Sequence, residues 1–194
     1  MDRFSNYLLK NNVSWHEILV DGESLNEIYI NKLNDILEED FNVILKRHKE
    51  NIKFIVLKQK LLNTMQNVIT VIAKSFNQSE FIPLGYEIEF KNGSIYAPME
   101  IKISDDKNMQ IIGKIDRVDI LKEDDTSYIR VVDYKSSQKT LEIDSIKEGI
   151  SLQLMTYLMC VSNTLEKKGQ NVIPAACVYF NLSDKLINLM DYTD

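Results

Sequence analysis

The chain has 194 residues, 44% hydrophobic and 27% charged, and its 23 basic and 29 acidic side chains give a formal net charge of −6. This size and apolar content indicate one compact domain and exclude a disordered chain, while six glycines and three prolines are too few for a turn-dense sandwich or a proline-rich linker. The acidic balance argues against a free-standing nucleic-acid binder, because non-specific binding depends on lysine and arginine side chains that neutralise phosphates.

The first part of the chain has the apolar spacing of amphipathic helices. Over residues 24–78 apolar side chains recur three and four positions apart, and this stretch contains neither glycine nor proline. We therefore expect two or more helices, with a helix end at the charged segment 38–40. Residues 1–80 are assigned to a helical segment that packs on the core.

After Pro83 the apolar period changes to two, which is typical of β-strands. A helix is expected from Asp144, a suitable N-cap, to Gly169, and a last strand of the buried kind is expected after it. This order predicts an α/β or α+β fold, in which helices flank a mixed β-sheet and the last helix crosses over between strands. The expected strands are residues 85–90, 99–104, 109–120, 128–134 and 173–181.

Two aspartates are expected to face each other on neighbouring strands. If a hairpin turn is centred on residues 124 and 125, Asp116 lies directly opposite Asp133. Opposed like charges destabilise a sheet unless a cation lies between them, and oxygen ligands of this kind suit Mg²⁺ or Mn²⁺. Lys135 shares a face with Asp133, where it could orient or deprotonate an attacking water or stabilise charge on a phosphate.

The same residues also allow a simpler interpretation, a solvated cluster of ion pairs around Arg117 that binds no metal. Val131 and Val132 bury the strand just before Asp133, however. The charged groups therefore lie at the edge of a core, where ligand sites are common. We favour the metal site.

Motifs at these positions resemble the RecB-like branch of the PD-(D/E)xK nuclease superfamily. The similarity is greatest to the C-terminal nuclease domain of the AddB-type subunit of bacterial ATP-dependent helicase/nucleases. The motifs together cover most of the chain: they are NNVSW at residues 11–15, FIPLGYE at 81–87, GKIDRVD at 113–119, VVDYKSS at 131–137 and GISLQLMTY at 149–157.

The resemblance implies roles for five side chains. Asp116 and Asp133 would hold the metal, and Lys135 would be the catalytic lysine. Gln153 and Tyr157 match the QxxxY motif of the family and would support the site, and a spacing of four places both on one helix face. For this pair, ordinary packing of a helix on a sheet is the alternative.

Other candidate ligands are expected outside the site. Glu87 and Glu89 alternate with apolar residues and are assigned to the solvated face of their strand. His16 and His48 are expected on the surface. Neither matches the metal-binding histidine that the family carries on a helix before its first motif, in a segment that would lie just before Met1.

The family also carries a 4Fe–4S cluster, held by one upstream cysteine and three cysteines in a C-terminal tail. Cys160 and Cys177 match none of these positions and are expected as buried thiols, so no iron–sulfur site is assigned to this chain. The chain is expected to be a fragment truncated at both ends. It contains no glycine-rich phosphate loop for ATP.

The resemblance implies a restriction-endonuclease-like core over residues 81–194 and a metal-dependent DNA exonuclease activity in double-strand-break processing and recombinational repair. The expected cofactor is Mg²⁺ or Mn²⁺, and the expected partners are DNA and an AddA-type helicase/nuclease subunit. No apolar run is long enough to span a membrane and the first residues do not resemble a signal peptide, so a bacterial cytoplasmic location is expected. Two alternatives stay open: a catalytically silent scaffold that binds DNA or another protein of the assembly, and a CRISPR-associated or phage-type RecB-like exonuclease.

Overall fold

The fold is that of a computed structural model, which describes residues 2–44, 52–135, 144 and 152–182. Helices come first, and the strands of the main sheet follow residue 81. Within the described residues, no helix is long and apolar enough to cross a membrane. In chain order the elements are α1 (Asp2–Lys10), the 3₁₀ helix η1 (Trp15–Glu17), β1 (Leu19–Val20), β2 (Ser24–Leu25), α2 (Glu27–Ile44), α3 (Ile52–Asn77), β3 (Ile82–Phe90), β4 (Met99–Ser104), β5 (Lys107–Ile111), β6 (Gly113–Glu123), β7 (Thr126–Lys135), α5 (Gln153–Lys167) and β8 (Asn171–Asn181).

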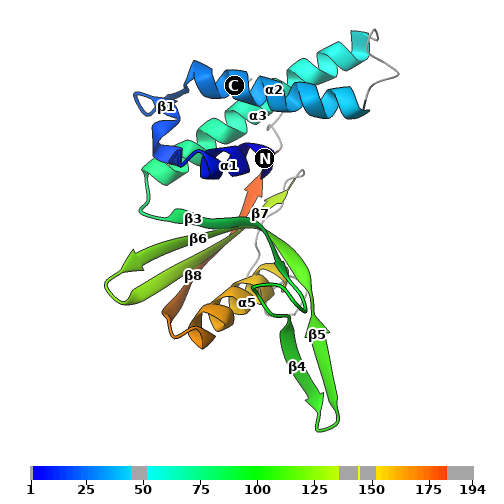
Figure 1. Cartoon of the computed structure of the whole chain (residues 1–194), viewed down its shortest axis with the longest axis vertical. Coiled ribbons are helices and arrows are strands. Elements are labelled where there is room, and N and C mark those ends of the chain that lie inside the picture. Colours follow the sequence, from blue (N-terminus) through cyan, green and yellow to red (C-terminus); the bar gives the residue numbers. More distant parts are fainter. Residues whose placement is uncertain (1, 45–51, 136–143, 145–151, 183–194) are drawn as a thin grey trace, which may run out of the picture.

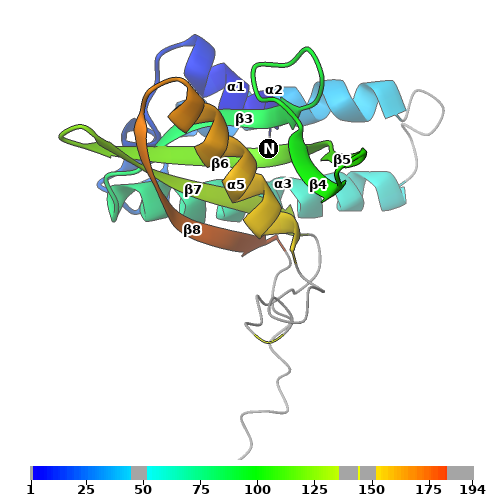
Figure 2. The same ribbon diagram turned by 90° about the horizontal axis from the view of Figure 1, so that it is seen from below.

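A four-stranded mixed sheet, the main sheet, forms the middle layer of the protein (Figure 1). Its strand order is β3-β6-β7-β8, in which β6 pairs antiparallel with β3 and β7, and β8 pairs parallel with β7. α5 connects β7 to β8 across one face of this sheet (Figure 2), and α1, α2 and α3 form a helical layer on the other face. The predicted mixed sheet with flanking helices and a crossover is confirmed.

Each face of the main sheet is covered by its own apolar core. Tyr134 and Phe180 reach the core of the helical layer from the sheet, and its fully buried members include Phe4, Leu8, Ile18, Leu33, Ile69, Ile72 and Phe76. The core on the other face joins β6 and β7 to α5, and its buried members include Val118, Ile120, Ile129, Val131, Leu154, Leu158 and Val161. The α5 members are three and four positions apart, so one apolar face fixes this helix on the sheet.

The hairpin of β6 and β7 has the register that the sequence predicts. Its pairing runs without a bulge from Arg117 opposite Val132 to the two-residue turn. Asp124 in this turn has a left-handed φ of 49°, which aspartate tolerates better than most residues. Asp116 and Asp133 therefore occupy the next position beyond the last pair of this ladder.

The predicted helix end at residues 38–40 is wrong, because α2 continues through this segment to Ile44. Arg3 of α1 and Lys58 of α3 form ion pairs with the three acidic residues of the segment. These partners are distant in sequence, so the helix keeps a run of like charges that would otherwise weaken it.

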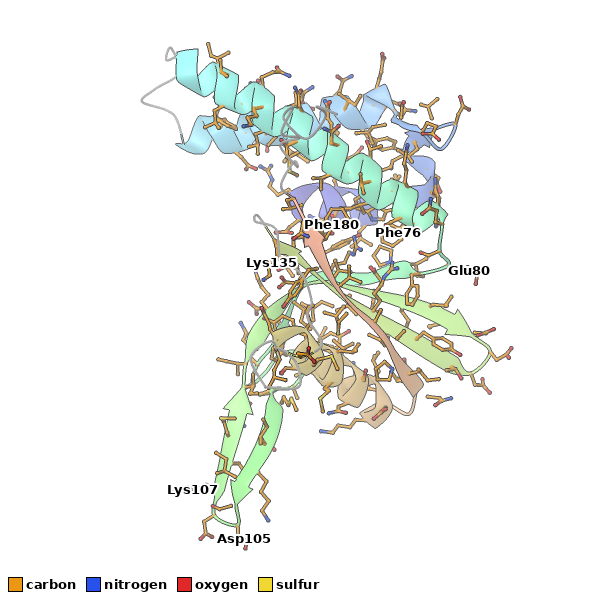
Figure 3. The ribbon with its side chains drawn as sticks, turned by 180° about the vertical axis from the view of Figure 1, so that it is seen from behind. Phe76, Glu80, Asp105, Lys107, Lys135 and Phe180 are labelled. Atoms are coloured by element: carbon orange, nitrogen blue, oxygen red, sulfur yellow. The ribbon has the colours of Figure 1, made fainter. Side chains whose placement is uncertain are left out.

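The predicted single strand over residues 109–120 is also wrong, because the chain leaves one sheet and enters another at Ile112. β5 pairs with β4 in a separate hairpin, which projects from the body of the protein to a tip near Lys107 (Figure 3). β6 begins at Gly113 beneath the Phe90 ring. A Cβ at this position would lie 2.6 Å from Cζ of that ring, so the close approach requires glycine.

The last strand is less buried than predicted. β8 is the edge strand of the main sheet, with β7 as its neighbour on one side, and most of its side chains are half-buried or exposed. A continuous apolar run does not distinguish a central strand from an edge strand, which explains the error.

The end of the last helix agrees with the prediction. Gly169 follows α5 with a φ of 82°, and its N–H donates to the carbonyl of Glu166 at 2.8 Å, as in a glycine-terminated helix. The predicted start of this helix falls largely on residues 145–151, which lie outside the described residues.

Candidate functional site

The end of β7 carries a buried carboxylate and a lysine. Asp133 is only 4% exposed, and Nζ of Lys135 lies 2.5 Å from its Oδ2. Lys135 lies at the end of the main sheet nearest the helical layer, next to Phe180 of β8 (Figure 3). Its Nζ lies 5.4 Å from the centroid of the Tyr179 ring. Partial burial opposes the charge of Lys135, but the hydrogen bond and negative charge of Asp133 outweigh it, so the pKa of Lys135 is raised. Lys135 is therefore a charged ammonium that points at a carboxylate.

Asp116, on the neighbouring strand β6, is held by the backbone of β7. Its Oδ2 accepts a hydrogen bond of 2.8 Å from the backbone N–H of Tyr134. Burial raises the pKa of Asp116, the hydrogen bond from Tyr134 lowers it, and the charge of Asp133 raises it further, with a net increase. The charge of Asp133 thus disfavours the ionised form of Asp116, and a divalent cation between the two carboxylates would remove this penalty.

The first turn of α5 brings an amide to the same carboxylate. Nε2 of Gln153 lies 3.5 Å from Oδ1 of Asp133, and it donates to the hydroxyl of Tyr157 at 2.8 Å. The Tyr157 ring packs edge-to-face on Phe90, with the ring centroids 5.3 Å apart. The structure therefore brings the predicted QxxxY pair to the predicted site.

Two carboxylates fit a hard divalent cation. Mg²⁺ keeps several waters and is commonly bound by one or two carboxylates together with phosphate oxygens, so Asp116 and Asp133 would supply its protein ligands. Among the described residues, no group of three or more His, Cys, Asp or Glu side chains could hold a metal ion. Asp116 and Asp133 therefore offer oxygen ligands of the kind that hard divalent cations prefer.

The remaining candidate ligands lie elsewhere. His16 is exposed on η1, where its Nδ1 lies 2.8 Å from Oδ1 of Asn77, and His48 lies outside the described residues. Cys160 is buried and Cys177 half-buried, and both are free thiols.

Two contributors to the site were not predicted. The backbone N–H of Tyr134 holds Asp116, and a pattern of side chains carries no information about backbone donors. Asp2, in the first turn of α1, lies near enough for its charge to raise the pKa of Asp116. α1 packs against both α2 and β3, and this tertiary packing brings Asp2 near the site, so the sequence around Asp116 contains no signal for it.

A strained residue lies across from Asp116 on β3. Glu87 has a φ of 51°, which is unfavourable for a residue with a side chain. The ladder pairs Tyr86 with Arg117 and Ile88 with Ile115, and it skips the position of Glu87 and Asp116 between them. The pairing of β3 with β6 is therefore interrupted at Asp116, whose carboxylate accepts a hydrogen bond from the backbone of β7.

Replacing Glu87 by glycine is expected to leave the free energy of unfolding unchanged or to raise it, because relief of a left-handed φ offsets the loss of an ion pair with Lys114. Glu89→Gly is the matched control. Glu89 lies on the same strand without a positive φ, and its replacement should cost about 1 kcal/mol. Urea unfolding measures both, and equal losses for the two variants would contradict the strain at Glu87.

Residues 16–193, which include all five predicted site residues, match the sequence profile of the PD-(D/E)XK nuclease superfamily. The chain therefore belongs to this superfamily, and its mixed sheet with flanking helices agrees with a restriction-endonuclease-like fold.

Curated relatives give a closer comparison. The B-type subunit of the ATP-dependent helicase/deoxyribonuclease of Ruminiclostridium cellulolyticum is 31% identical over 192 residues, which are 98% of this chain and 16% of that protein. The proteins of the same name from Thermoanaerobacter sp. (strain X514) and Clostridioides difficile (strain 630) are 30% and 31% identical over 195 and 201 residues, which are 100% of this chain and 16% of each protein. The chain thus spans about 16% of the length of these relatives, and the predicted similarity to proteins of this type is confirmed.

Proposed function

We propose that the chain is a metal-dependent DNA nuclease domain, which hydrolyses phosphodiester bonds as an exonuclease within a larger helicase/nuclease protein. The observation that carries the proposal is the meeting of Asp116, Asp133 and Lys135 at one end of the β6–β7 hairpin, in a chain that belongs to a nuclease superfamily.

In this mechanism Asp116 and Asp133 would hold Mg²⁺ or Mn²⁺. The chemistry that such an ion supplies is activation of water and neutralisation of charge on the phosphodiester. Lys135, whose raised pKa favours the ammonium form, stabilises the negative charge that develops on the phosphate and orients the attacking water. Gln153 keeps the carboxylate of Asp133 in place, and Tyr157 in turn holds Gln153.

The names of the relatives support a wider role as part of the proposal. We assign DNA as the substrate, an AddA-type helicase/nuclease subunit as the partner, and the processing of broken DNA ends in the bacterial cytoplasm as the setting. Residues 1–80 would serve as a helical segment on a nuclease core of residues 81–194. With a net charge of −6, the chain would depend on the rest of the assembly for much of its affinity for DNA.

A metal titration tests the proposed ligands. The melting temperature Tm of the chain should rise by roughly 5–10 °C in Mn²⁺ at about 100 times its Kd, because a ligand that binds only the folded state stabilises it. Asp116→Asn and Asp133→Asn should each abolish most of this rise. Asp106→Asn, at an exposed turn of the β4–β5 hairpin, is the matched control and should keep it.

The outcomes separate the proposal from its alternatives. A rise that persists in Asp116→Asn and Asp133→Asn would exclude these residues as ligands. A wild-type Tm that does not respond to millimolar Mn²⁺, together with no cleavage of single-stranded DNA, would favour the silent scaffold.

A further inference from the structure

A buried cluster of charges lies between the main sheet and the helical layer. Arg117 is 3% exposed and Asp119 is fully buried, and Nε of Arg117 lies 3.1 Å from Oδ1 of Asp119. Nε of Arg130 donates to the other oxygen of Asp119 at 2.9 Å. The Arg117 guanidinium also lies 5.0 Å from the centroid of the Phe76 ring of α3. Charges buried this deeply require such partners.

One contact connects this cluster to the proposed metal site. Nη1 of Arg117 donates to the hydroxyl of Tyr134 at 2.9 Å, and the guanidinium lies 5.7 Å from the centroid of the same ring. Phe180 packs edge-to-face on Tyr134, with the ring centroids 5.7 Å apart. The side chain of Tyr134 is thus fixed toward the helical layer, while its backbone N–H holds Asp116.

We propose that Arg117 is a positioning residue for the metal site. It holds the side chain of Tyr134 and thereby fixes the end of β7 where the Tyr134 N–H meets Asp116. The planar guanidinium suits this task, because Nε faces Asp119 while Nη1 faces Tyr134, and the fork allows little independent movement. The inference rests on the proposed function, since it assigns Arg117 to the same metal site.

Arg130 distinguishes this role from a purely structural one. It binds the same carboxylate as Arg117 and lies 5.9 Å from the Phe76 ring centroid and 4.4 Å from that of Phe81. Within the part of the chain that the structure describes, it makes no hydrogen bond, ion pair or ring contact with Tyr134. Loss of either arginine disrupts the buried cluster, but only loss of Arg117 releases Tyr134.

The experiment measures the Mn²⁺ concentration that gives half of the metal-induced rise in Tm of the chain. Arg117→Met and Tyr134→Phe should each raise this midpoint about tenfold, as expected for loss of a group that orients a metal ligand. The double variant should be no worse than either single variant, because both break the same contact. Arg130→Met should lower the Tm of the metal-free chain but leave the midpoint within about twofold of wild type.

Two results would overturn the inference: equal midpoints for Arg117→Met and Arg130→Met, or a double variant whose shift is the product of the two single shifts. If Arg117→Met does not fold, Tyr134→Phe decides alone. It keeps the ring and removes only the hydroxyl, and an unchanged midpoint would overturn the inference. A wild-type chain that does not respond to Mn²⁺ would overturn the proposed metal site together with the inference, so the two failures are distinguishable.

Discussion

Replacing Lys135 by alanine is expected to lower the rate of Mg²⁺-dependent hydrolysis of single-stranded DNA by about 10²–10³-fold. In the proposed mechanism its ammonium stabilises the charge on the reacting phosphate, and alanine leaves nothing in its place. Metal binding by Asp116 and Asp133 does not require the lysine, so the rise of Tm in Mn²⁺ should persist. Single-turnover cleavage of an end-labelled oligonucleotide at saturating Mg²⁺ measures the rate.

Lys114→Ala is the matched control for Lys135→Ala. Lys114 lies on the neighbouring strand but forms its ion pair with Glu87, and its replacement should change the rate by no more than about twofold. Lys135→Arg separates charge from proton transfer, because arginine keeps the charge but does not accept a proton. A rate above about a tenth of wild type in Lys135→Arg would support the electrostatic role. Cleavage at the wild-type rate in Lys135→Ala would contradict any catalytic role for this lysine.

Replacing Asp119 by alanine is expected to lower the free energy of unfolding by about 3–5 kcal/mol. Burial raises the pKa of Asp119 more than the charges of Arg117 and Arg130 lower it. The surroundings therefore do not stabilise the ionised carboxylate on balance. The loss in Asp119→Ala comes from the two guanidinium groups, which remain buried without their counter-charge. Equilibrium unfolding in urea measures this loss, provided that the slope with denaturant is unchanged.

Two further variants serve as controls for the loss of stability in Asp119→Ala. Asp106→Ala, at an exposed turn, should change the free energy of unfolding by less than about 0.5 kcal/mol. The triple variant Arg117→Met, Asp119→Leu and Arg130→Met replaces the whole cluster by apolar side chains and should recover most of the lost stability. A loss below about 1 kcal/mol in Asp119→Ala would show that water or a shifted side chain compensates the arginines.

The relation between Asp116 and Asp133 could be predicted because it depends on local chemistry. A two-residue turn at Asp124 fixes the register of a hairpin, and the alternation of side chains then fixes which residues share a face. The same reasoning could not predict that Arg117 contacts Tyr134, because that contact also depends on the helical layer that packs above both residues. The metal, catalytic and supporting roles of the site residues remain predictions.

The errors in the predicted elements have identifiable physical causes. The change of sheet at Ile112 precedes Gly113, and a glycine inside an apparent strand is a recognised sign of a bend or a close approach, so this break could have been found. The continuation of α2 through residues 38–40 could not have been predicted, because it depends on ion pairs with Arg3 and Lys58 from other helices. The exposure of β8 depends on its place in the strand order, which no local pattern contains.

The pairing of β6 with β7 joins residues no more than 15 positions apart, whereas the pairing of β7 with β8 joins residues 45 or more positions apart. The chain entropy lost on closing a loop grows with the length of that loop. Asp116 and Asp133, which repel each other, are therefore brought together by the shortest loop of the main sheet. Gln153 and Tyr157, which are neutral, lie within the longest. The repulsion between the two carboxylates is thus overcome in the pairing of β6 with β7, which loses the least chain entropy on loop closure in the main sheet.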